Sequence, residues 1–593
     1  MTRIQCSIIF ALTFAACFTA ASSTFAKPNI VVILTDDQGW GDLSVHGNTN
    51  IATPAIDSLA KDGALLDRFF VCQVCAPTRA EFLTGRYYPR TGVTGVSTGQ
   101  GRLNADEVTI GDTFKAAGYA TGAFGKWHNG TQPPYHPNDR GFDEYYGFTS
   151  GHWGLYFDPP LDHNGKDVRG KGFIIDDLTT HAIEFIEDNK DKPFFCYVPF
   201  NTPHSPMQVP GRFYKKFDGT DLKMLNRDPS LENIPMTRAA LAMCENIDWN
   251  VGRILTKLDE LKIADNTIVI YFSDNGPNSW RWNGGMKGKK GAIDEGGLRV
   301  PMLVRWPGHI PAGLRVSRIA SGIDLLPTLA DMAGAKLIST KPLDGVSIKP
   351  LLTGNEKDWP QRRIFSFAGP RRKSGPTVSI RTQRFRYDAK GQLFDIPTDP
   401  GQNIDVAKQH PEKVQQLAAA ARRHGKVMAA DFTKYRERPF TVGYGPSTKL
   451  PARDGVAHGN IQRSARAPNN SYFTAWTSPS DTITWDIEVG QTGDYEATVY
   501  YTCKAGDVGS TITLTMEAAG GTSAKVTEAH DPPHLDENLG RSKRGSESYV
   551  KIFKPLALGT IKLDKGRGVL TLGANDIVGA QVIDVHSVVL VRK

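Results

Sequence analysis

The chain has 593 residues, more than one compact core usually holds, so two or three domains are expected. With 40% apolar and 22% charged residues, its composition excludes a largely disordered protein. The formal net charge of +8 is mild for this length and is as typical of an ordinary basic surface as of a protein with an anionic substrate. The basic residues form no array interleaved with aromatic residues, so nucleic acid is not expected as a partner.

Residues 1–26 have the pattern of a secretion signal: a positive charge, a short apolar run and a cleavage site of small residues. The run is too short for a membrane span, and no later segment has the pattern of a transmembrane helix. Lipid attachment at Cys17 is an alternative, although the residue before the two preceding alanines fits it poorly. We therefore expect a secreted or periplasmic protein whose mature chain starts near Lys27.

Two of the seven cysteines lie in this segment, and five remain: Cys72, Cys75, Cys196, Cys244 and Cys503. An odd number in an oxidising compartment means that one cysteine has another role or is buried and inert. Cys72 and Cys75 form a C-x-x-C pair, which alone suggests a thioredoxin-like redox site. The residues after Cys75 indicate a different chemistry.

Three continuous runs of apolar, β-branched residues predict central parallel strands buried on both faces: 28–35, 193–199 and 267–273. Helical patterns lie between them, at 54–62, 77–85 and 237–261. Strands that alternate with helices predict an α/β domain over 27–336, with helices on both sides of its sheet. Ligands of such folds bind at the carboxyl ends of the strands.

Acidic and amide side chains come after two of these runs. Asp36 and Asp37 come directly after the first, and Asp274 and Asn275 come after the third. Adjacent carboxylates beyond a strand end repel each other unless a cation neutralises them. Taken alone, however, the first pair is typical of an exposed turn and the second of the start of a turn.

The pattern changes after residue 336. Short strands and one helix predict a small antiparallel sheet with a terminal helix over 337–438, at 364–368, 377–381, 385–388, 393–395 and 411–423. The Pro- and Gly-rich stretch 439–455 predicts a linker.

Residues 456–593 alternate apolar and polar side chains between Gly-rich turns, which predicts an additional all-β sandwich. This domain is similar in pattern to carbohydrate-binding modules. Trp476, Trp485 and Tyr501 are candidates to stack on sugar rings, although the alternation favours a core position for Trp485.

The most specific pattern is Cys75-Ala76-Pro77-Thr78-Arg79, which continues to Leu83-Thr84-Gly85-Arg86. Pro77 suits the first turn of a helix, so residue 75 would lie at a helix N-terminus, where free amides and the helix dipole favour an anion. A buried cysteine before an ordinary helix is the alternative. The run resembles the C-x-P-[S/T]-R and L-T-G-R signature of the type I, formylglycine-dependent sulfatases, which are arylsulfatase-like members of the alkaline phosphatase superfamily.

Three further segments match motifs of that family. Lys126 and His128 lie in G-K-W-H-N-G, where Asn129 replaces a common leucine, and His204 ends T-P-H. Lys290 precedes Glu295 by five residues, as the family's lysine does, whereas Lys287 and Lys289 are expected in a solvated basic loop. The resemblance covers about 27–425.

The resemblance implies an alkaline phosphatase-like fold, with a mixed, mainly parallel sheet flanked by helices. It implies that a formylglycine-generating or radical maturation enzyme converts Cys75 to formylglycine, the nucleophile, which also explains the odd cysteine. The implied ligands of one calcium ion are Asp36, Asp37, Cys75, Asp274 and Asn275. The two strand-end pairs form an all-oxygen set, which fits calcium or magnesium rather than zinc.

The implied catalytic residues are Cys75, Arg79, Lys126, His128, His204 and Lys290. Arg79 would hold residue 75, and the two lysines would offset the charge of the sulfate oxygens. His204 or Lys290 would protonate the leaving alcohol, and His128 would take the proton whose loss releases sulfate.

Secretion, the appended sandwich and nearby aromatic residues favour a sulfated polysaccharide or oligosaccharide over a small aryl sulfate. Candidate substrate contacts, each equally consistent with a structural loop residue, are His152, Trp153, Trp280, Arg281 and Trp282. Two rival functions stay open: a phosphonate or phosphate monoester hydrolase of the same superfamily, and a non-catalytic glycan-binding protein.

Overall fold

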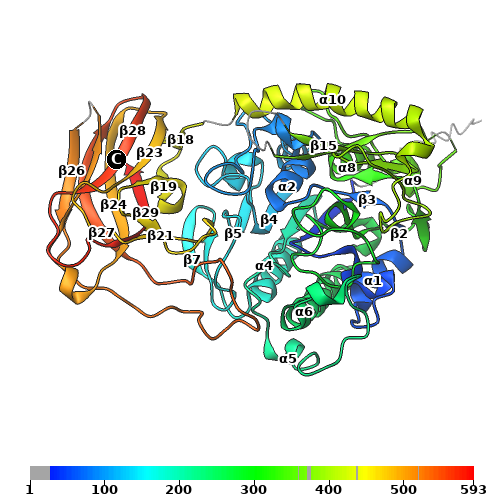
Figure 1. Ribbon diagram of the computed structural model, residues 1–593, viewed down its shortest axis with the longest axis horizontal. Coiled ribbons are helices and arrows are strands. Elements are labelled where there is room, and N and C mark those ends of the chain that lie inside the picture. Colours follow the sequence, from blue (N-terminus) through cyan, green and yellow to red (C-terminus); the bar gives the residue numbers. More distant parts are fainter. Residues whose placement is uncertain (1–26, 358, 370–375, 436–437, 518–519) are drawn as a thin grey trace, which may run out of the picture.

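The computed structural model describes residues 27–593 apart from 358, 370–375, 436–437 and 518–519 (Figure 1). The predicted signal peptide, 1–26 including Cys17, lies outside the described residues. A large α/β body and a β-sandwich lie side by side, and the long helix α10 (Pro411–Lys434) runs along one edge of the body (Figure 1). Over the described ranges, no helix is both long and apolar enough to cross a membrane.

The body is built on a ten-stranded sheet whose central strands are parallel. The central strands have the order β9 (Thr267–Ser273), β1 (Asn29–Thr35), β8 (Phe194–Pro199), β4 (Ala120–Lys126) and β5 (Glu144–Phe148). Shorter strands extend both edges: β11 (Met302–Arg305), β2 (Ala64–Leu66), β12 (Leu314–Val316), β6 (Pro160–His163) and β7 (Lys166–Arg169). Because β11 and β6 run antiparallel to their central neighbours, the sheet is mixed and mainly parallel, which confirms the expected fold class.

Helices cover both faces of the sheet, because successive side chains of a buried strand point to opposite sides. Ile30 and Val32 of β1 belong to the core beneath α2 (Cys75–Thr84), α3 (Ile110–Ala116) and α8 (Leu325–Met332). Val31 and Ile33 belong to the opposite core, beneath α1 (Pro54–Lys61), α4 (Ile174–Asp188) and α6 (Ile234–Glu260). The three predicted helices are α1, α2 and α6, and α2 already begins at Cys75.

The second part of the body is the expected small antiparallel sheet with its helix. The sheet contains β14 (Ile364–Ala368), β15 (Thr377–Arg381), β16 (Phe385–Tyr387) and β17 (Leu393–Asp395). α10 continues beyond residue 423 because Met428 and Phe432 keep the helical spacing of buried residues. Shorter elements complete the body: β3 (Phe69–Phe70), β10 (Arg299–Val300), β13 (Ala320–Ser321), α5 (Gly211–Tyr214), α7 (Glu295–Leu298) and α9 (Lys349–Leu352).

The C-terminal part is a sandwich of two sheets around one apolar core. One sheet contains β18 (Phe440–Val442), β20 (Val456–His458), β23 (Thr482–Val489), β28 (Gly566–Ala574), β25 (Thr511–Met516) and β26 (Gly520–Lys525). The other contains β19 (Ser447–Pro451), β21 (Gln462–Arg463), β22 (Phe473–Thr474), β29 (Asp584–Arg592), β24 (Gly493–Thr502) and β27 (Lys554–Leu563).

The prediction of a linker over 439–455 is wrong. This stretch supplies β18, which pairs with β23, and β19, which pairs with β29. Its prolines and glycines lie around these short strands, while Phe440, Val442 and Leu450 are buried in the sandwich core. The sandwich therefore starts at β18 and comes almost directly after the body.

The aromatic residues suggested as sugar platforms are core residues instead. Trp476 and Trp485 are each 1% exposed, and Tyr501 is 2% exposed. All three belong to the apolar cluster between the two sheets. The alternation correctly indicated a core position for Trp485, and it applies to Tyr501 of β24 as well, whereas Trp476 enters the core from the segment after β22.

Candidate active site

The acidic pairs meet because β1 and β9 are neighbours in the sheet and end at the same edge. The Asp274 amide donates to the Thr35 carbonyl over 3.0 Å, and the Asp37 amide donates to Asp274 Oδ1 over 3.2 Å. Asn275 Nδ2 donates to Asp37 Oδ1 over 2.8 Å. Asp36, Asp37, Asp274 and Asn275 are all buried. The sheet topology thus brings residues 237 positions apart into direct contact.

Helix α2 presents its first residue, Cys75, to these carboxylates. The Cys75 sulfur and one oxygen each of Asp36 and Asp274 lie within 4.8 Å of one another. Thr78 Oγ donates to the Asp274 carbonyl over 2.6 Å. Arg79 donates to Asp274 Oδ2 through Nε at 3.1 Å and Nη2 at 2.8 Å. Two residues of the first turns thus fix the helix N-terminus against the end of β9.

Two lysines and a histidine complete the charge distribution. Lys126 Nζ, at the end of β4, is 2.6 Å from Asp36 Oδ2, and Lys290 Nζ is 2.6 Å from Asp37 Oδ1. His204 Nε2 is 3.6 Å from Asp37 Oδ2. The structure therefore brings together every residue expected to bind the metal and four of the expected catalytic side chains besides Cys75.

The pKa values of the three carboxylates indicate which of them the neighbouring cations keep negatively charged. Burial would raise the pKa of Asp36, but Lys126 and the other cations nearby hold it well below its usual range. The pKa of Asp37 is also lowered, by His204 and Lys290 against burial. Burial and the Asp36 charge raise the pKa of Asp274 to about 7. The cations of the protein thus keep Asp36 and Asp37 ionised. Asp274 needs further positive charge to be ionised to the same degree.

The side chains present fit a divalent cation on independent grounds. Asp36 Oδ1 and Asn275 Oδ1 are buried oxygens without a hydrogen-bond partner among the described residues. Unpaired buried oxygens are costly unless a ligand satisfies them. The surrounding donors are carboxylate and amide oxygens, the ligands that calcium and magnesium prefer.

His128 lies after β4 with a left-handed backbone, φ 67°, which is uncommon for a non-glycine residue. Its Nε2 is 2.8 Å from the Val96 carbonyl, and since a carbonyl only accepts, Nε2 carries the proton. Burial, followed by the charge of Lys126, holds the pKa of His128 well below its usual value, so the ring is neutral. Nδ1 is buried with no partner within the described part of the chain. It is therefore available as a proton acceptor.

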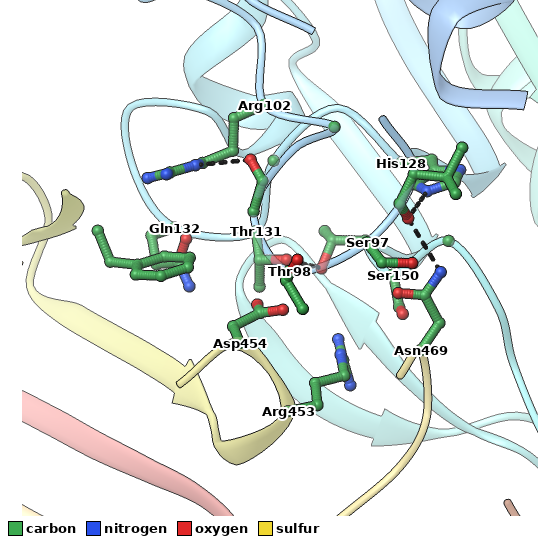
Figure 2. A pocket seen from close by; sticks show the side chains of 17 residues that line it. Ser97, Thr98, Arg102, His128, Thr131, Gln132, Ser150, Arg453, Asp454 and Asn469 are labelled. Carbon is green, nitrogen blue, oxygen red and sulfur yellow. Dashed lines mark hydrogen bonds between the residues drawn. The ribbon is translucent and has the colours of Figure 1, made fainter. Parts of the chain in front are cut away.

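A pocket adjoins His128 and has walls from both parts of the protein (Figure 2). Its labelled lining residues include Ser97, Thr98, Arg102 and Ser150 from the body, and Arg453, Asp454 and Asn469 from the sandwich. Gly151 also lines it, and a Cβ at that position would overlap His128 Nε2. No sequence signal indicated that the sandwich would reach the site.

The five candidate substrate contacts separate into different environments. His152 is buried, with its ring centroid 5.3 Å from that of His204. Trp153 stacks on Phe148 at 4.8 Å, and Trp280 lies 5.6 Å from Lys289 Nζ. Trp282 packs against Trp40 at 6.3 Å.

Arg281 has a structural role, which corrects its prediction as a substrate contact. It is 1% exposed, and Nε and Nη2 donate to Asp42 over 2.8 and 2.7 Å. Nη2 also donates to the Asp37 carbonyl over 3.0 Å, and Nη1 donates to Asn278 and Ser279. The guanidinium of Arg281 thus uses all its donors in hydrogen bonds. The one to the Asp37 carbonyl supports the backbone of this proposed metal ligand.

The hydrogen bonds of Asn129 give a reason for an asparagine at the position where the family motif commonly has leucine. Its Nδ2 donates to the Ala76 carbonyl over 3.3 Å and to the Gly101 carbonyl over 3.1 Å. It therefore ties the first turn of α2 to the loop that lines the pocket, a contact that a leucine would not make.

Lys290 and Lys289 provide a direct test of these assignments. Lys290→Met is expected to lower kcat/KM for sulfate release at least about a hundredfold, because it removes the positive charge that pairs with the buried Asp37. Lys289→Met is expected to change it less than about fivefold, because the only hydrogen bond of the Lys289 ammonium to the described residues goes to the Asn278 carbonyl at 3.3 Å. Steady-state kinetics of both variants on one substrate measures the two effects. Equal effects of the two substitutions would contradict the assignment.

Comparisons with known proteins identify the family of this chain and agree with its fold. The Sulfatase family model matches residues 28–335, and that for the N-sulphoglucosamine sulphohydrolase C-terminal region matches 288–424. N-acetylgalactosamine-6-sulfatase of Mus musculus is 31% identical over 68% of this chain and 81% of its own length. Arylsulfatase A of Homo sapiens is 31% identical over 67% of this chain and 88% of its own.

A solved structure gives the same result in three dimensions. The crystal structure of Ps i-CgsB in complex with k-i-k-neocarrahexaose is 33% identical, with a TM-score of 0.60, over 68% of this chain and 93% of that one. The matched family model spans the strands and helices that carry the acidic pairs, Cys75, Lys126 and His204. The chain belongs to the sulfatase family and is a hydrolase of sulfate esters.

Proposed function

We propose that this sulfatase releases sulfate from sulfated polysaccharides or oligosaccharides, using a formylglycine made from Cys75 and one bound calcium ion. The observation that carries the proposal is the position of residue 75. It is the first residue of α2 and lies against Asp36 and Asp274, and it interacts electrostatically with Lys126 and Lys290. A helix N-terminus and two lysines make this a favourable position for a sulfate group.

The proposal explains why residue 75 needs modification. Burial raises the pKa of the Cys75 thiol, so an unmodified cysteine stays protonated and is a weak nucleophile. A formylglycine supplies a hydrated aldehyde, one hydroxyl of which can attack sulfur while the other allows sulfate to leave by elimination. Arg79 keeps Asp274 oriented toward this residue.

The surrounding residues take complementary parts. Lys126 and Lys290 are held by the carboxylates they pair with, so their charges are already oriented toward sulfate oxygens. Asp37 and Cys75 outweigh burial and hold the pKa of Lys290 above its usual value, which leaves it charged. His204 or Lys290 donates a proton to the leaving alcohol. His128 accepts a proton at Nδ1, since Nε2 already donates to Val96.

Asp36, Asp37, Asp274, Asn275 and residue 75 would hold the calcium ion. The bound ion supplies Lewis-acid polarisation of the sulfate S–O bonds. The unpaired Asp36 and Asn275 oxygens support this assignment.

A carbohydrate substrate is supported by the names of the relatives and by the appended sandwich. N-acetylgalactosamine-6-sulfatase is named for a sugar, and the similar solved structure is a complex with a neocarrahexaose. Secretion through the 1–26 signal would expose the enzyme to extracellular glycans. We retain 27–336 and 337–438 as the bounds of the catalytic domain and its subdomain.

A substrate panel tests the proposal. Purified enzyme is given sulfated glycans, an aryl sulfate and the matched aryl phosphonate, and sulfate or phenol release is measured. We expect turnover of at least one glycan and at least about a hundredfold preference for sulfate over phosphonate. A preference for the phosphonate would identify the rival hydrolase. Glycan binding without turnover of any ester would identify the non-catalytic alternative.

A further inference from the structure

The sandwich extends a long connection onto the body. Residues 526–553, between β26 and β27, leave the sandwich and run across to the body (orange in Figure 1). The Arg541 amide donates to the Met207 carbonyl over 2.8 Å, and the Arg541 guanidinium lies 4.8 Å from the Tyr214 ring centroid. Arg544 Nη2 donates to the Gly154 carbonyl over 2.9 Å. The connection is thus fixed to the body near both His204 and His152, through Met207 and Gly154.

Glu547 lies at this attachment and points its carboxylate at the active-site loops. Its Oε1 accepts from Ser205 Oγ over 2.6 Å and lies 3.5 Å from His152 Nδ1. Ser205 is the residue after His204, whose Nε2 faces Asp37. A row of side chains therefore leads from a proposed metal ligand, through His204 and His152, to a residue of the sandwich.

This row has unused hydrogen-bonding capacity. Glu547 Oε2 and His152 Nε2 are buried without a hydrogen-bond partner among the residues described, and His152 Nδ1 has only its long, 3.5 Å contact with Glu547 Oε1 there. Burial, followed by the charges of His204 and Arg544, holds the pKa of His152 well below its usual value, so its neutral ring offers one donor and one acceptor. Unused buried groups of this kind are unfavourable unless a ligand pairs with them.

The hydrogen-bonding groups of this row indicate which kind of ligand it binds. A carboxylate only accepts, so the partner of Glu547 must donate, as a hydroxyl group does and a sulfate group does not. A metal ion suits the row less well, because His204 Nδ1 already donates to the Ser205 carbonyl over 2.7 Å and His204 Nε2 faces Asp37 Oδ2 at 3.6 Å. The 14% and 11% exposed side chains of Glu547 and His204 show that the row reaches solvent.

A second contact places the sandwich on the other side of the site. Asn469 Nδ2 donates over 3.0 Å to the Val96 carbonyl that also accepts from His128. Gly151, the neighbour of His152, lines the same pocket as Asn469. Sandwich residues thus adjoin both histidines expected to transfer protons.

We propose that the β-sandwich is part of the substrate site, and that Glu547, together with His152, binds hydroxyl groups of the sugar that bears the sulfate ester. The negative charge of Glu547 disfavours a sugar with a second sulfate or a carboxylate at the adjacent position. The inference rests on the proposed function and adds a substrate class to it: sugars that carry one sulfate and free neighbouring hydroxyls.

Glu547→Gln tests this, with Glu537→Gln as the matched control. Glu537 lies on the same connection, has a 57% exposed side chain, and pairs with His534. For a monosulfated glycan we expect Glu547→Gln to raise KM about tenfold or more with a much smaller change in kcat. The preference for monosulfated over disulfated sugar should fall at least about tenfold. The activity of Glu547→Gln on an aryl sulfate, which lacks the hydroxyls, should fall much less than its activity on the glycan, and all activities of Glu537→Gln should stay within about twofold.

Other outcomes overturn the inference. An unchanged KM and an unchanged preference would exclude Glu547 as a sugar contact. An equal loss on the aryl sulfate would show that Glu547 only positions His204. Zinc that copurifies with the wild-type protein and is lost from Glu547→Gln would identify a metal site instead. If the wild-type protein releases sulfate from no glycan, the proposed function and this inference both fail, whereas an active wild type with an unaffected variant refutes the inference alone.

Discussion

Replacing Cys75 by alanine is expected to lower kcat for sulfate release by at least about a thousandfold, on glycan and aryl sulfate alike. The substitution removes the thiol group that is oxidised to the formylglycine aldehyde, so no hydrate hydroxyl can form, while the buried neighbours that fix the start of α2 stay in place. Ion chromatography of released sulfate measures the effect. Mass spectrometry of the wild-type peptide should show an aldehyde in place of the thiol at residue 75.

Cys72→Ala is the matched control for this experiment. Cys72 is buried three residues before Cys75, and among the described residues all five cysteines are free thiols. If Cys75 acts alone, Cys72→Ala should retain activity within about threefold. Equal losses from the two substitutions would favour the C-x-x-C redox interpretation. Wild-type activity in Cys75→Ala would exclude a formylglycine mechanism.

The central fold and the centre of the site were predictable because their signals are local. Continuous apolar runs marked β1, β8 and β9, and the topology of such a sheet places the residues after β1 and after β9 at one edge. Pro77 indicated a helix start, and α2 begins at Cys75. Each of these inferences needs only neighbouring residues and a rule about where strand ends meet.

The errors have a different origin, because they depend on pairings between distant segments. Phe440–Val442 pairs with Ile487–Val489, a contact that the Pro- and Gly-rich composition around it obscures. Arg281 comes after the metal pair as a substrate contact might, but Asp42 engages it from across the fold. Glu547 has no motif around it and becomes part of the site only through a 526–553 connection that crosses to the body. The position and role of such residues depend on tertiary packing rather than on local sequence preference.

Removing calcium with a chelator is expected to lower sulfate release at least about a hundredfold, and added calcium should restore it better than magnesium. The reason is the charge of the site: three buried carboxylates lie together, and without further positive charge the pKa of Asp274 is raised to about 7. The ion should therefore stabilise the fold as well as the reaction. Saturation at a hundred times Kd adds about 2.7 kcal/mol to the free energy of unfolding, which raises the melting temperature.

The inactive Cys75→Ala variant separates binding of the ion from catalysis, because it retains the four oxygen-bearing ligands of the strand ends. Its melting temperature should still rise with calcium, whereas Asp37→Asn, which removes one buried charge, should show a much smaller rise. Metal analysis before and after chelation confirms that the ion is lost. Full activity in protein shown to be free of metal would contradict the assignment, and so would better restoration by zinc than by calcium, because an all-oxygen site disfavours zinc. A calcium-dependent melting temperature in a protein without turnover would instead show that the acidic strand ends bind the ion for stability alone.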